Sequence, residues 1–278
     1  MVVHVHIIPG SFTLERFYVP LRNAVIAAGY EASITPLLSA GKRDGQPAAT
    51  MEEDAQHIRK ANEALLEQGK DIVLVMHSYG GIPGTQSVEG LLKSEREKTG
   101  QAGGVARLVY LTALAPEPGR SLNDVMAPLM EKYKDVSYVK VEGDYMSHEH
   151  ELSAKFTFSD LPAEEGLALA KQMPHHSTIS FSGKLSYPAY NYVGTSYIVC
   201  TEDLCVPVDL QRSMIRSIER ESGRKIHVQD LMSGHFPMWS RPAETARMIA
   251  AAVEQMNVPT YRSVDKVKLM NAAVEQAV

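Results

Sequence analysis

Residues 72–81 read IVLVMHSYGG, and this stretch decides the fold expected for the whole chain. Its first five residues are all apolar, as in a central parallel strand that is buried on both faces. Ser78 follows, and the pair Gly80-Gly81 then opens a predicted helix. A serine on a sharp turn between a strand and a helix is the setting of a nucleophile elbow, where a strained backbone presents the hydroxyl.

An alternative interpretation stays open at this turn. The usual elbow has a glycine two positions before the serine, but here that position is Met76. Serine is also a common helix N-cap, which is a purely structural role. The apolar strand before Ser78 and the two glycines after it favour the nucleophile.

An alternation of strands and helices extends on both sides of this stretch. Further strands are expected at 2–8, 30–36, 107–113, 196–200 and 225–229. Helices are expected at 14–28, 51–65, 81–93, 207–220 and 242–256. Thr50 and Glu53 form a capping box at the start of the second helix. The alternation predicts the α/β class, with a mostly parallel sheet of about six strands flanked by helices.

The alternation breaks in the middle of the chain. Residues 116–192 are rich in Pro, Gly, Met and Tyr, with short helical patterns near 121–133 and 162–173 and no strong core strand. We interpret this segment as a lid inserted over the sheet edge, within a core made of 1–115 and 193–257.

The last segment, 258–278, is expected to be a C-terminal helical extension. Its apolar residues recur at helical spacing at Val264, Val267, Met270 and Val274. This stripe is expected to pack on the core or, alternatively, on a second subunit, which would make a homodimer.

Composition excludes several classes of protein. Of the 278 residues, 44% are hydrophobic and 22% are charged, as in a globular protein, and the net charge of −5 leaves no basic surface for nucleic acid. No apolar run approaches the roughly 18 residues of a membrane span, and the first residues lack the pattern of a secretory signal. Cys200 and Cys205 are too few for a disulfide framework, so we expect reduced thiols in a cytoplasmic protein.

A serine hydroxyl needs a neighbouring imidazole to remove its proton. In hydrolases with this elbow the order along the chain is serine, acid, histidine. His235 fits, because it lies in the loop SGHFPMWSRP (233–242) between the last expected strand and the last expected helix. Asp203 is the favoured acid, since it follows the strand at 196–200, with Glu202 and Asp209 as competitors. These carboxylates could instead serve only to cap the helix that follows.

A developing oxyanion needs backbone N–H donors. The N–H of Tyr79, directly after the nucleophile, is one candidate. The N–H of Ser11, in the loop after the first strand, is the other, and Gly10 allows a close approach there. An ordinary turn is the alternative interpretation of this loop.

Three histidine pairs are alternative sites for a metal: His4 with His6, His148 with His150, and His175 with His176. No carboxylate or cysteine is spaced to complete any of them, so neither a metal nor a cofactor is expected.

Several of these motifs, in this order, resemble the α/β-hydrolase superfamily. More narrowly, the chain resembles the branch of plant methylesterases and hydroxynitrile lyases and related fungal and bacterial hydrolases. The resemblance covers nearly the whole chain through PGSF (9–12), HSYGG (77–81), FSDLPAEE (158–165), YIVCTED (197–203) and SGHFPMWSRP (233–242). Hydroxynitrile lyases of this branch carry a lysine after the catalytic histidine and a threonine in the first oxyanion loop. This chain has Phe236 and Gly10 there, so the resemblance implies ester hydrolysis.

Together these features predict a serine hydrolase that acts on a small apolar or aromatic ester or lactone through an acyl-enzyme. The substrate pocket is expected to include Gly10, Phe12, His77, Phe236, Met126, Tyr145 and Phe158, with further lid residues Met130, Tyr133, Met146 and Phe156. Plain packing is the alternative role for the Met and aromatic residues. Carbon–carbon bond hydrolysis or lyase chemistry with the same triad, and a non-hydrolytic ligand-binding protein, are the alternative functions.

Overall fold

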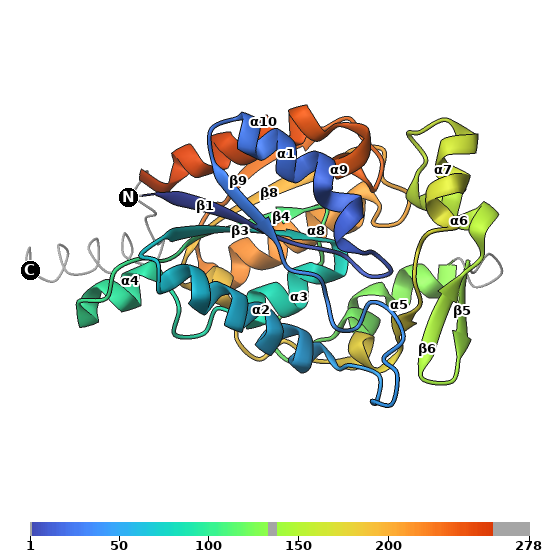
Figure 1. The fold of residues 1–278 in the computed structure, drawn as a ribbon, viewed down its shortest axis with the longest axis horizontal. Helices are drawn as coiled ribbons and strands as arrows, with labels where there is room; N and C mark the ends of the chain where they lie inside the picture. The colour runs from blue at the N-terminus through green and yellow to red at the C-terminus, as the bar shows by residue number, and fades with distance from the viewer. Residues whose placement is uncertain (1, 133–137, 258–278) are drawn as a thin grey trace, which may run out of the picture.

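One parallel sheet forms the centre of the molecule. The computed structural model describes residues 2–132 and 138–257. The strand order in the main sheet is β2-β1-β3-β4-β8-β9, and every neighbouring pair in it is parallel. Its strands are β1 (Val3–Ile8), β2 (Glu31–Ile34), β3 (Asp71–His77), β4 (Gly104–Leu111), β8 (Gly194–Cys200) and β9 (His227–Leu231) (Figure 1). The predicted α/β class with a parallel sheet of about six strands is confirmed.

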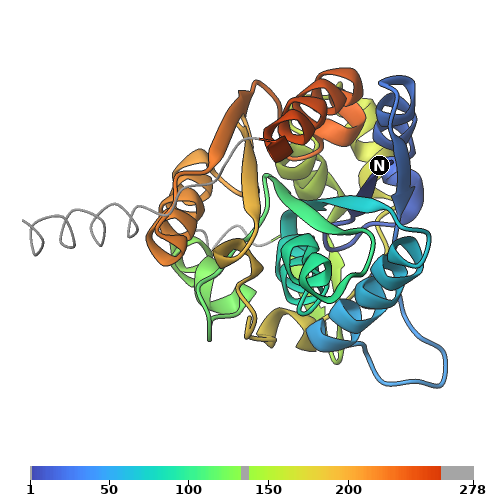
Figure 2. The same ribbon diagram turned by 90° about the vertical axis from the view of Figure 1, so that its left-hand side faces the viewer.

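Helices cover both faces of this sheet. The α-helices of the core are α1 (Val19–Ala27), α2 (Met51–Leu66), α3 (Gly81–Gln86), α4 (Lys93–Arg96), α8 (Val208–Ser222), α9 (Pro237–Ser240) and α10 (Pro242–Glu254). Short 3-10 helices are η1 (Glu15–Tyr18), η2 (Ser78–Gly80), η3 (Glu97–Thr99), η5 (Ile179–Ser182), η6 (Ala189–Asn191) and η7 (Gln255–Asn257). α1 and α10 pack side by side on one face, as the end-on view shows, and α2, α3 and α8 supply the core of the other face (Figure 2).

Strand β3 shows why helices are needed on both faces of the sheet. All seven of its residues are buried. Its side chains alternate, so Ile72, Leu74 and Met76 enter the core beneath α2 and α3. Val73 and Val75 enter the core beneath α1 and α10. A strand with no solvated face has no polar alternation, which is what the apolar run indicated.

The helix expected at 81–93 is wrong in its extent. It ends at Gln86, and a separate short helix begins at Lys93. Between them Gly90 takes a positive φ of 71°, and Leu92 forms a parallel bridge with Val105 beside the sheet. The apolar residues of this stretch are buried by a turn and not by a continuous helical face.

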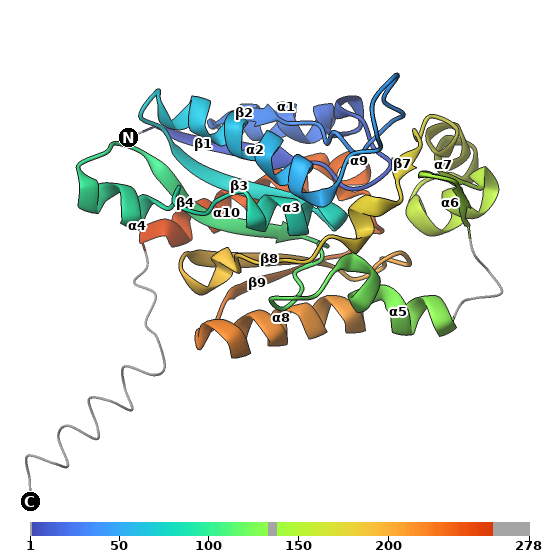
Figure 3. The ribbon, with the colours of Figure 1, turned by 90° about the horizontal axis from the view of Figure 1, so that it is seen from below.

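Residues between β4 and β8 form a second group of elements. Its elements are α5 (Leu122–Lys132), β5 (Val139–Glu142), β6 (Tyr145–His148), α6 (His150–Thr157), α7 (Ala163–Ala170) and β7 (His176–Ser177). β5, β6 and β7 make a small antiparallel sheet that is separate from the main one. α6, α7 and the antiparallel pair β5 and β6 lie at the end of the molecule where the parallel strands finish (Figures 1 and 3). Whether 116–192 acts as a lid stays a prediction.

Two further expectations concern a membrane span and the C-terminal segment. Within 2–132 and 138–257, no helix combines the length and apolar character that crossing a membrane requires. The extension predicted at 258–278, with its apolar stripe, lies outside the described residues. The homodimer that was its alternative stays a prediction.

Candidate active site

Ser78 lies on a strained turn between β3 and α3. Its φ is +51°, in the left-handed region that a serine rarely adopts. The turn is possible because Gly80 has no side chain: a Cβ there would come 2.2 Å from the backbone oxygen of Pro9. The strand, the strained serine and the tight glycine are the local features of a nucleophile elbow.

Met76 takes the place of the usual first elbow glycine, and α3 makes room for it. A Cβ on Gly84 would lie only 2.6 Å from the Met76 sulfur, so this helical glycine accommodates the large side chain. The glycine missing from the strand is therefore compensated by one on the facing helix. The elbow keeps its shape without the common pattern.

His235 reaches Ser78 from the loop between β9 and α9. Its Nε2 lies 3.1 Å from Ser78 Oγ, and its Nδ1 lies 2.7 Å from Asp203 Oδ2. All three residues are buried. The structure thus brings together three residues that are 157 and 32 positions apart in sequence.

Asp203 is fixed by four donors. Its Oδ2 accepts from the His235 ring and from the hydroxyl of Thr112, at 2.5 Å from Thr112 Oγ1. Its Oδ1 accepts from the backbone N–H groups of Cys205 and Val206, at 2.7 and 2.9 Å. These four donors fix the position of the carboxylate beside His235.

The two competing acids, Glu202 and Asp209, lie at the protein surface. Glu202 and Asp209 are exposed, whereas Asp203 is 3% exposed and bonded to the imidazole. Of these three carboxylates, only Asp203 is placed to orient His235.

The loop after β1, which is predicted to supply an oxyanion donor, lies directly against Ser78. A Cβ on Gly10 would come 2.9 Å from the Ser78 Cβ and 2.8 Å from His77 Nδ1, so only glycine fits there. The Gly10 N–H donates to the Tyr18 hydroxyl, at 2.7 Å. The donor roles of the Ser11 N–H, on this loop, and of the Tyr79 N–H, in η2, stay predictions.

His77 joins this loop to the base loop. Its Nε2 lies 2.9 Å from the backbone oxygen of His235, which can only accept, so Nε2 carries the proton. Nδ1 therefore accepts from the Tyr18 hydroxyl at 2.7 Å, and Tyr18 in turn accepts from Gly10. Burial holds the pKa of His77 well below its usual value, which keeps the ring neutral. Both ring nitrogens are engaged by the protein, and the pocket-lining role predicted for His77 stays untested.

Tyr79 is anchored from the opposite side. Its hydroxyl donates to Asp54 Oδ2 at 3.0 Å, and Asp54 also accepts from the N–H and the hydroxyl of Ser39. Burial raises the pKa of Asp54 despite these donors. The residue after the nucleophile is thus tied to α2.

The other predicted pocket residues fall into two groups. Phe158 and Phe236 are buried against each other, with ring centroids 4.6 Å apart, and Phe12 is buried beside His148 and His176. Met126 is partly buried against the core, and the Tyr145 hydroxyl accepts from the backbone N–H of Arg43 at 3.2 Å. Of the further residues suggested, Tyr133 lies outside the described residues. Their contact with a substrate stays a prediction.

Sequence analysis missed several positioning residues. Asp160, within the predicted lid, accepts from the hydroxyls of Ser233 and Ser240 at 2.9 and 2.6 Å, and so ties that segment to the His235 loop. Its place in the motif FSDLPAEE was a usable signal. Tyr18, Thr112 and Asp54 carried none, because their partners are distant in sequence.

Among the residues that the structure describes, one group of three side chains has the ligand types and the spacing that a metal ion needs. Ligand atoms of Asp203, Cys205 and His235 lie within 4.8 Å of one another. Burial raises the pKa of the Cys205 thiol to about 12, and a protonated thiol is a poor ligand. The ring nitrogens of His4 and His6 are bonded to protein oxygens. These contacts fit a proton-transfer triad better than a metal site.

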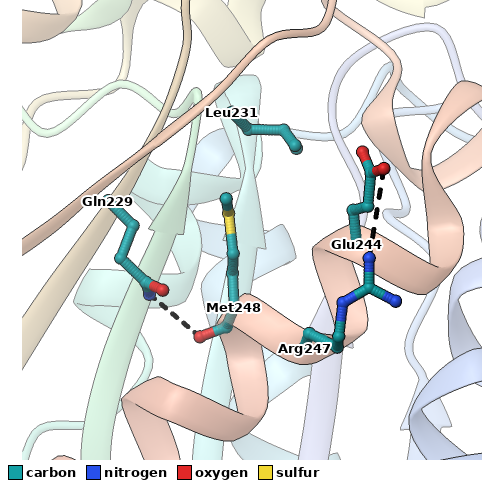
Figure 4. A pocket seen from close by; sticks show the side chains of 5 residues that line it. All are labelled: Gln229, Leu231, Glu244, Arg247 and Met248. Carbon is teal, nitrogen blue, oxygen red and sulfur yellow. Dashed lines mark hydrogen bonds and ion pairs between the residues drawn. The ribbon is translucent and has the colours of Figure 1, made fainter.

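A pocket of about 290 Å³ lies away from this site, between β9 and α10. It is lined by Gln229, Leu231, Glu244, Arg247 and Met248 (Figure 4). Gln229 donates to the backbone oxygen of Met248 at 2.9 Å, and Arg247 pairs with Glu244 at 4.0 Å. Its lining includes neither Ser78, His235 or Asp203 nor any residue of the loop after β1.

Comparison with known proteins shows which sequences and folds this chain resembles. A model of the alpha/beta hydrolase family matches residues 2–248. The chain is 34% identical over 244 residues to a probable hydrolase of Phoma sp., which covers 88% of this chain and 95% of that protein. It is 27% identical over 242 residues to methylesterase 7 of Arabidopsis thaliana, covering 80% and 85% respectively. The crystal structure of polyneuridine aldehyde esterase matches with a TM-score of 0.69 at 19% identity, over 90% of this chain and 99% of that one, which is a likeness of fold.

Proposed function

The chain belongs to the alpha/beta hydrolase family, in its plant methylesterase-like branch, and on that basis we propose that it hydrolyses a carboxylic ester through an acyl-enzyme on Ser78. The observation that carries the proposal is the connected set Ser78–His235–Asp203, with contacts of 3.1 and 2.7 Å. The relatives named as esterases support the choice of an ester substrate.

The hydrogen bonds define the proton path. Asp203 accepts from Nδ1–H of His235, so Nε2 is free to accept the proton of Ser78. As the oxygen of Ser78 bonds to the substrate carbonyl carbon, the proton passes to Nε2 and the carbonyl oxygen becomes an oxyanion. His235 then returns the proton to the leaving alcohol, and the acyl group remains on Ser78.

Water completes the cycle by the same steps. His235 takes a proton from water, the resulting hydroxide attacks the acyl carbon, and the acid leaves as the Ser78 oxygen regains a proton. The backbone N–H groups of Ser11 and Tyr79 are the donors proposed for both oxyanions. The aromatic residues Phe12, Phe158 and Phe236 near the site favour a small, mostly apolar or aromatic ester or lactone.

An activity screen tests the proposal. Methyl esters, aryl esters and lactones are offered to the wild type and to Ser78→Ala and His235→Ala. The matched controls are Ser186→Ala and His150→Ala, which replace an exposed serine and an exposed histidine. We expect turnover of some esters by the wild type and controls, and a loss of at least about 10³-fold in the two site variants.

Equal turnover by all five proteins would contradict the proposal. A β-diketone in the same screen tests carbon–carbon bond hydrolysis by the same triad. Tight binding of an ester without turnover would instead indicate a ligand-binding protein on this fold.

A further inference from the structure

His148 presents a buried nitrogen that the protein leaves without a partner. It ends β6, and its Nδ1 lies 2.8 Å from the hydroxyl oxygen of Ser153. Its Nε2 is buried and, among the residues that the structure describes, has no hydrogen-bond partner. A buried polar atom of this kind costs free energy unless a ligand pairs with it.

The contact with Ser153 decides which nitrogen carries the proton. Within the described part of the chain, His148 is the one acceptor that the Ser153 hydroxyl contacts. The hydroxyl therefore donates to Nδ1, which places the ring hydrogen on Nε2. The unpaired group is a hydrogen-bond donor.

Three contacts place this donor at the candidate active site. The His148 ring packs on Phe12, next to the oxyanion loop, with centroids 4.0 Å apart. Tyr138 packs edge-on against the same ring, with centroids 5.5 Å apart, and the Tyr138 hydroxyl donates to the sulfur of Cys205, two residues after the proposed acid Asp203. The ring is also close enough to His235 for the two to interact electrostatically. His148 thus lies between the oxyanion loop and the acid loop.

We propose that Nε2–H of His148 binds a second oxygen of the substrate, so that the preferred esters carry an uncharged acceptor, such as a ketone or ether oxygen, beyond the scissile carboxyl group. This inference rests on the proposed ester hydrolysis and adds the substrate class to it. The alternative, that the nitrogen is simply buried among aromatic rings, makes no demand on the substrate.

An uncharged acceptor is favoured over a carboxylate because the ring itself is neutral. Burial lowers the pKa of His148 to about 3, and the nearby His150 and His235 lower it further. A neutral donor in an aromatic setting offers no positive charge to offset the desolvation of an anion.

Matched esters test the proposal. Aryl esters of straight-chain acids are compared with analogues of equal length in which one methylene, at each position in turn, is replaced by a carbonyl or an ether oxygen. We expect the wild type to favour one acceptor position by roughly tenfold or more in kcat/KM, since a buried donor is then paired. His148→Phe should lose that preference, so that its kcat/KM is the same for the plain ester and for the acceptor-bearing analogues.

Two polar variants keep the test informative if His148→Phe folds poorly. In His148→Gln the amide N–H reaches about as far as Nε2, so the preference should be retained. In His148→Asn the shorter amide reaches only the position of Nδ1, so the preference should be lost. His150→Gln, an exposed neighbour on the same segment, is the control and should behave as the wild type.

Equal kcat/KM for plain and acceptor-bearing esters at every position would overturn the inference while leaving ester hydrolysis intact. A preference that survives in both His148→Phe and His148→Asn would also overturn it. Failure of the wild type to hydrolyse any ester would overturn the proposed function, and the inference with it.

Discussion

The hydroxyl of Thr112 donates to the carboxylate of Asp203 from a backbone that is itself strained. Its Oγ1 lies 2.5 Å from Asp203 Oδ2, and its φ is +38°, an unfavourable value for a β-branched residue. Only two other non-glycine residues of the described chain have positive φ, Phe12 at 57° and Ser78 at 51°. All three flank the candidate active site, and strain of this kind costs about 1–3 kcal/mol per residue.

The first prediction concerns that threonine. Thr112→Val keeps the shape but removes a donor to Asp203, so kcat for an ester should fall by about tenfold while KM changes little. Thr112→Ser keeps the hydroxyl and should retain most of the activity. Steady-state kinetics on the three proteins checks this, and equal kcat for wild type and Thr112→Val would show that the contact does not matter.

Removing the whole side chain separates strain from catalysis. Thr112→Gly relieves the positive φ, so it should raise the free energy of unfolding or leave it unchanged, even as kcat falls. A large loss of stability in urea denaturation would argue that Thr112 is held by packing alone.

A second prediction concerns the link between the oxyanion loop and the base loop. Tyr18→Phe removes the hydroxyl that bridges Gly10 and His77, leaving a buried N–H and a buried ring nitrogen unpaired. We expect a loss of about 1–3 kcal/mol in the free energy of unfolding and a lower kcat. Tyr192→Phe, at a tyrosine that is 48% exposed, is the control and should change neither quantity.

The choice of acid is tested by three amide substitutions. Asp203→Asn should lower kcat by about 10³- to 10⁴-fold, because the amide no longer holds His235 in the tautomer that accepts from Ser78. Glu202→Gln and Asp209→Asn, at exposed carboxylates, should remain near the wild type. If Glu202→Gln were the damaging change, the assignment of Asp203 would be wrong.

Stability should depend on pH through the buried histidine His6. Its two ring nitrogens lie 2.7 Å from Asn62 Oδ1 and Thr35 Oγ1, and burial lowers the pKa of His6 to about 4. Between about pH 6.5 and pH 4 the unfolded chain binds a proton that the folded chain excludes, so the free energy of unfolding falls as the pH falls through this range. His6 changes the free energy of unfolding by about 3 kcal/mol over this range, and the full stability is present above about pH 6.5.

Urea denaturation at several pH values measures this effect. His6→Gln cannot titrate, so its stability should fall less steeply between pH 6.5 and pH 4 than that of the wild type. The exposed His150→Gln serves as the control and should follow the wild-type slope. Identical slopes for all three proteins would contradict the pKa assigned to His6.

The parts that could be predicted from sequence are those with a local signal. The apolar run before Ser78 predicted a buried strand, and His235 was found from its loop between a strand and a helix. Asp203 was favoured from its place after β8. Each depends on neighbours within about ten residues, which the sequence shows directly.

The parts that could not be predicted depend on contacts between distant residues. Tyr18 and His77 are 59 positions apart, and Thr112 and Asp203 are 91 apart, so no spacing indicates either pair. The helix expected at 81–93 was too long because the apolar residues of the turn mimic a helical face. The antiparallel strands β5–β7 have two to four residues each, too few to show a period.

The central claim is that one serine hydroxyl is activated by an imidazole from a distant loop. The most direct measurement is the intact mass of the protein after treatment with a fluorophosphonate, followed by mapping of the modified peptide. A single adduct on Ser78 that is absent in Ser78→Ala and much slower to form in His235→Ala is the predicted result. An unmodified wild-type protein, or an adduct on another residue, would contradict it.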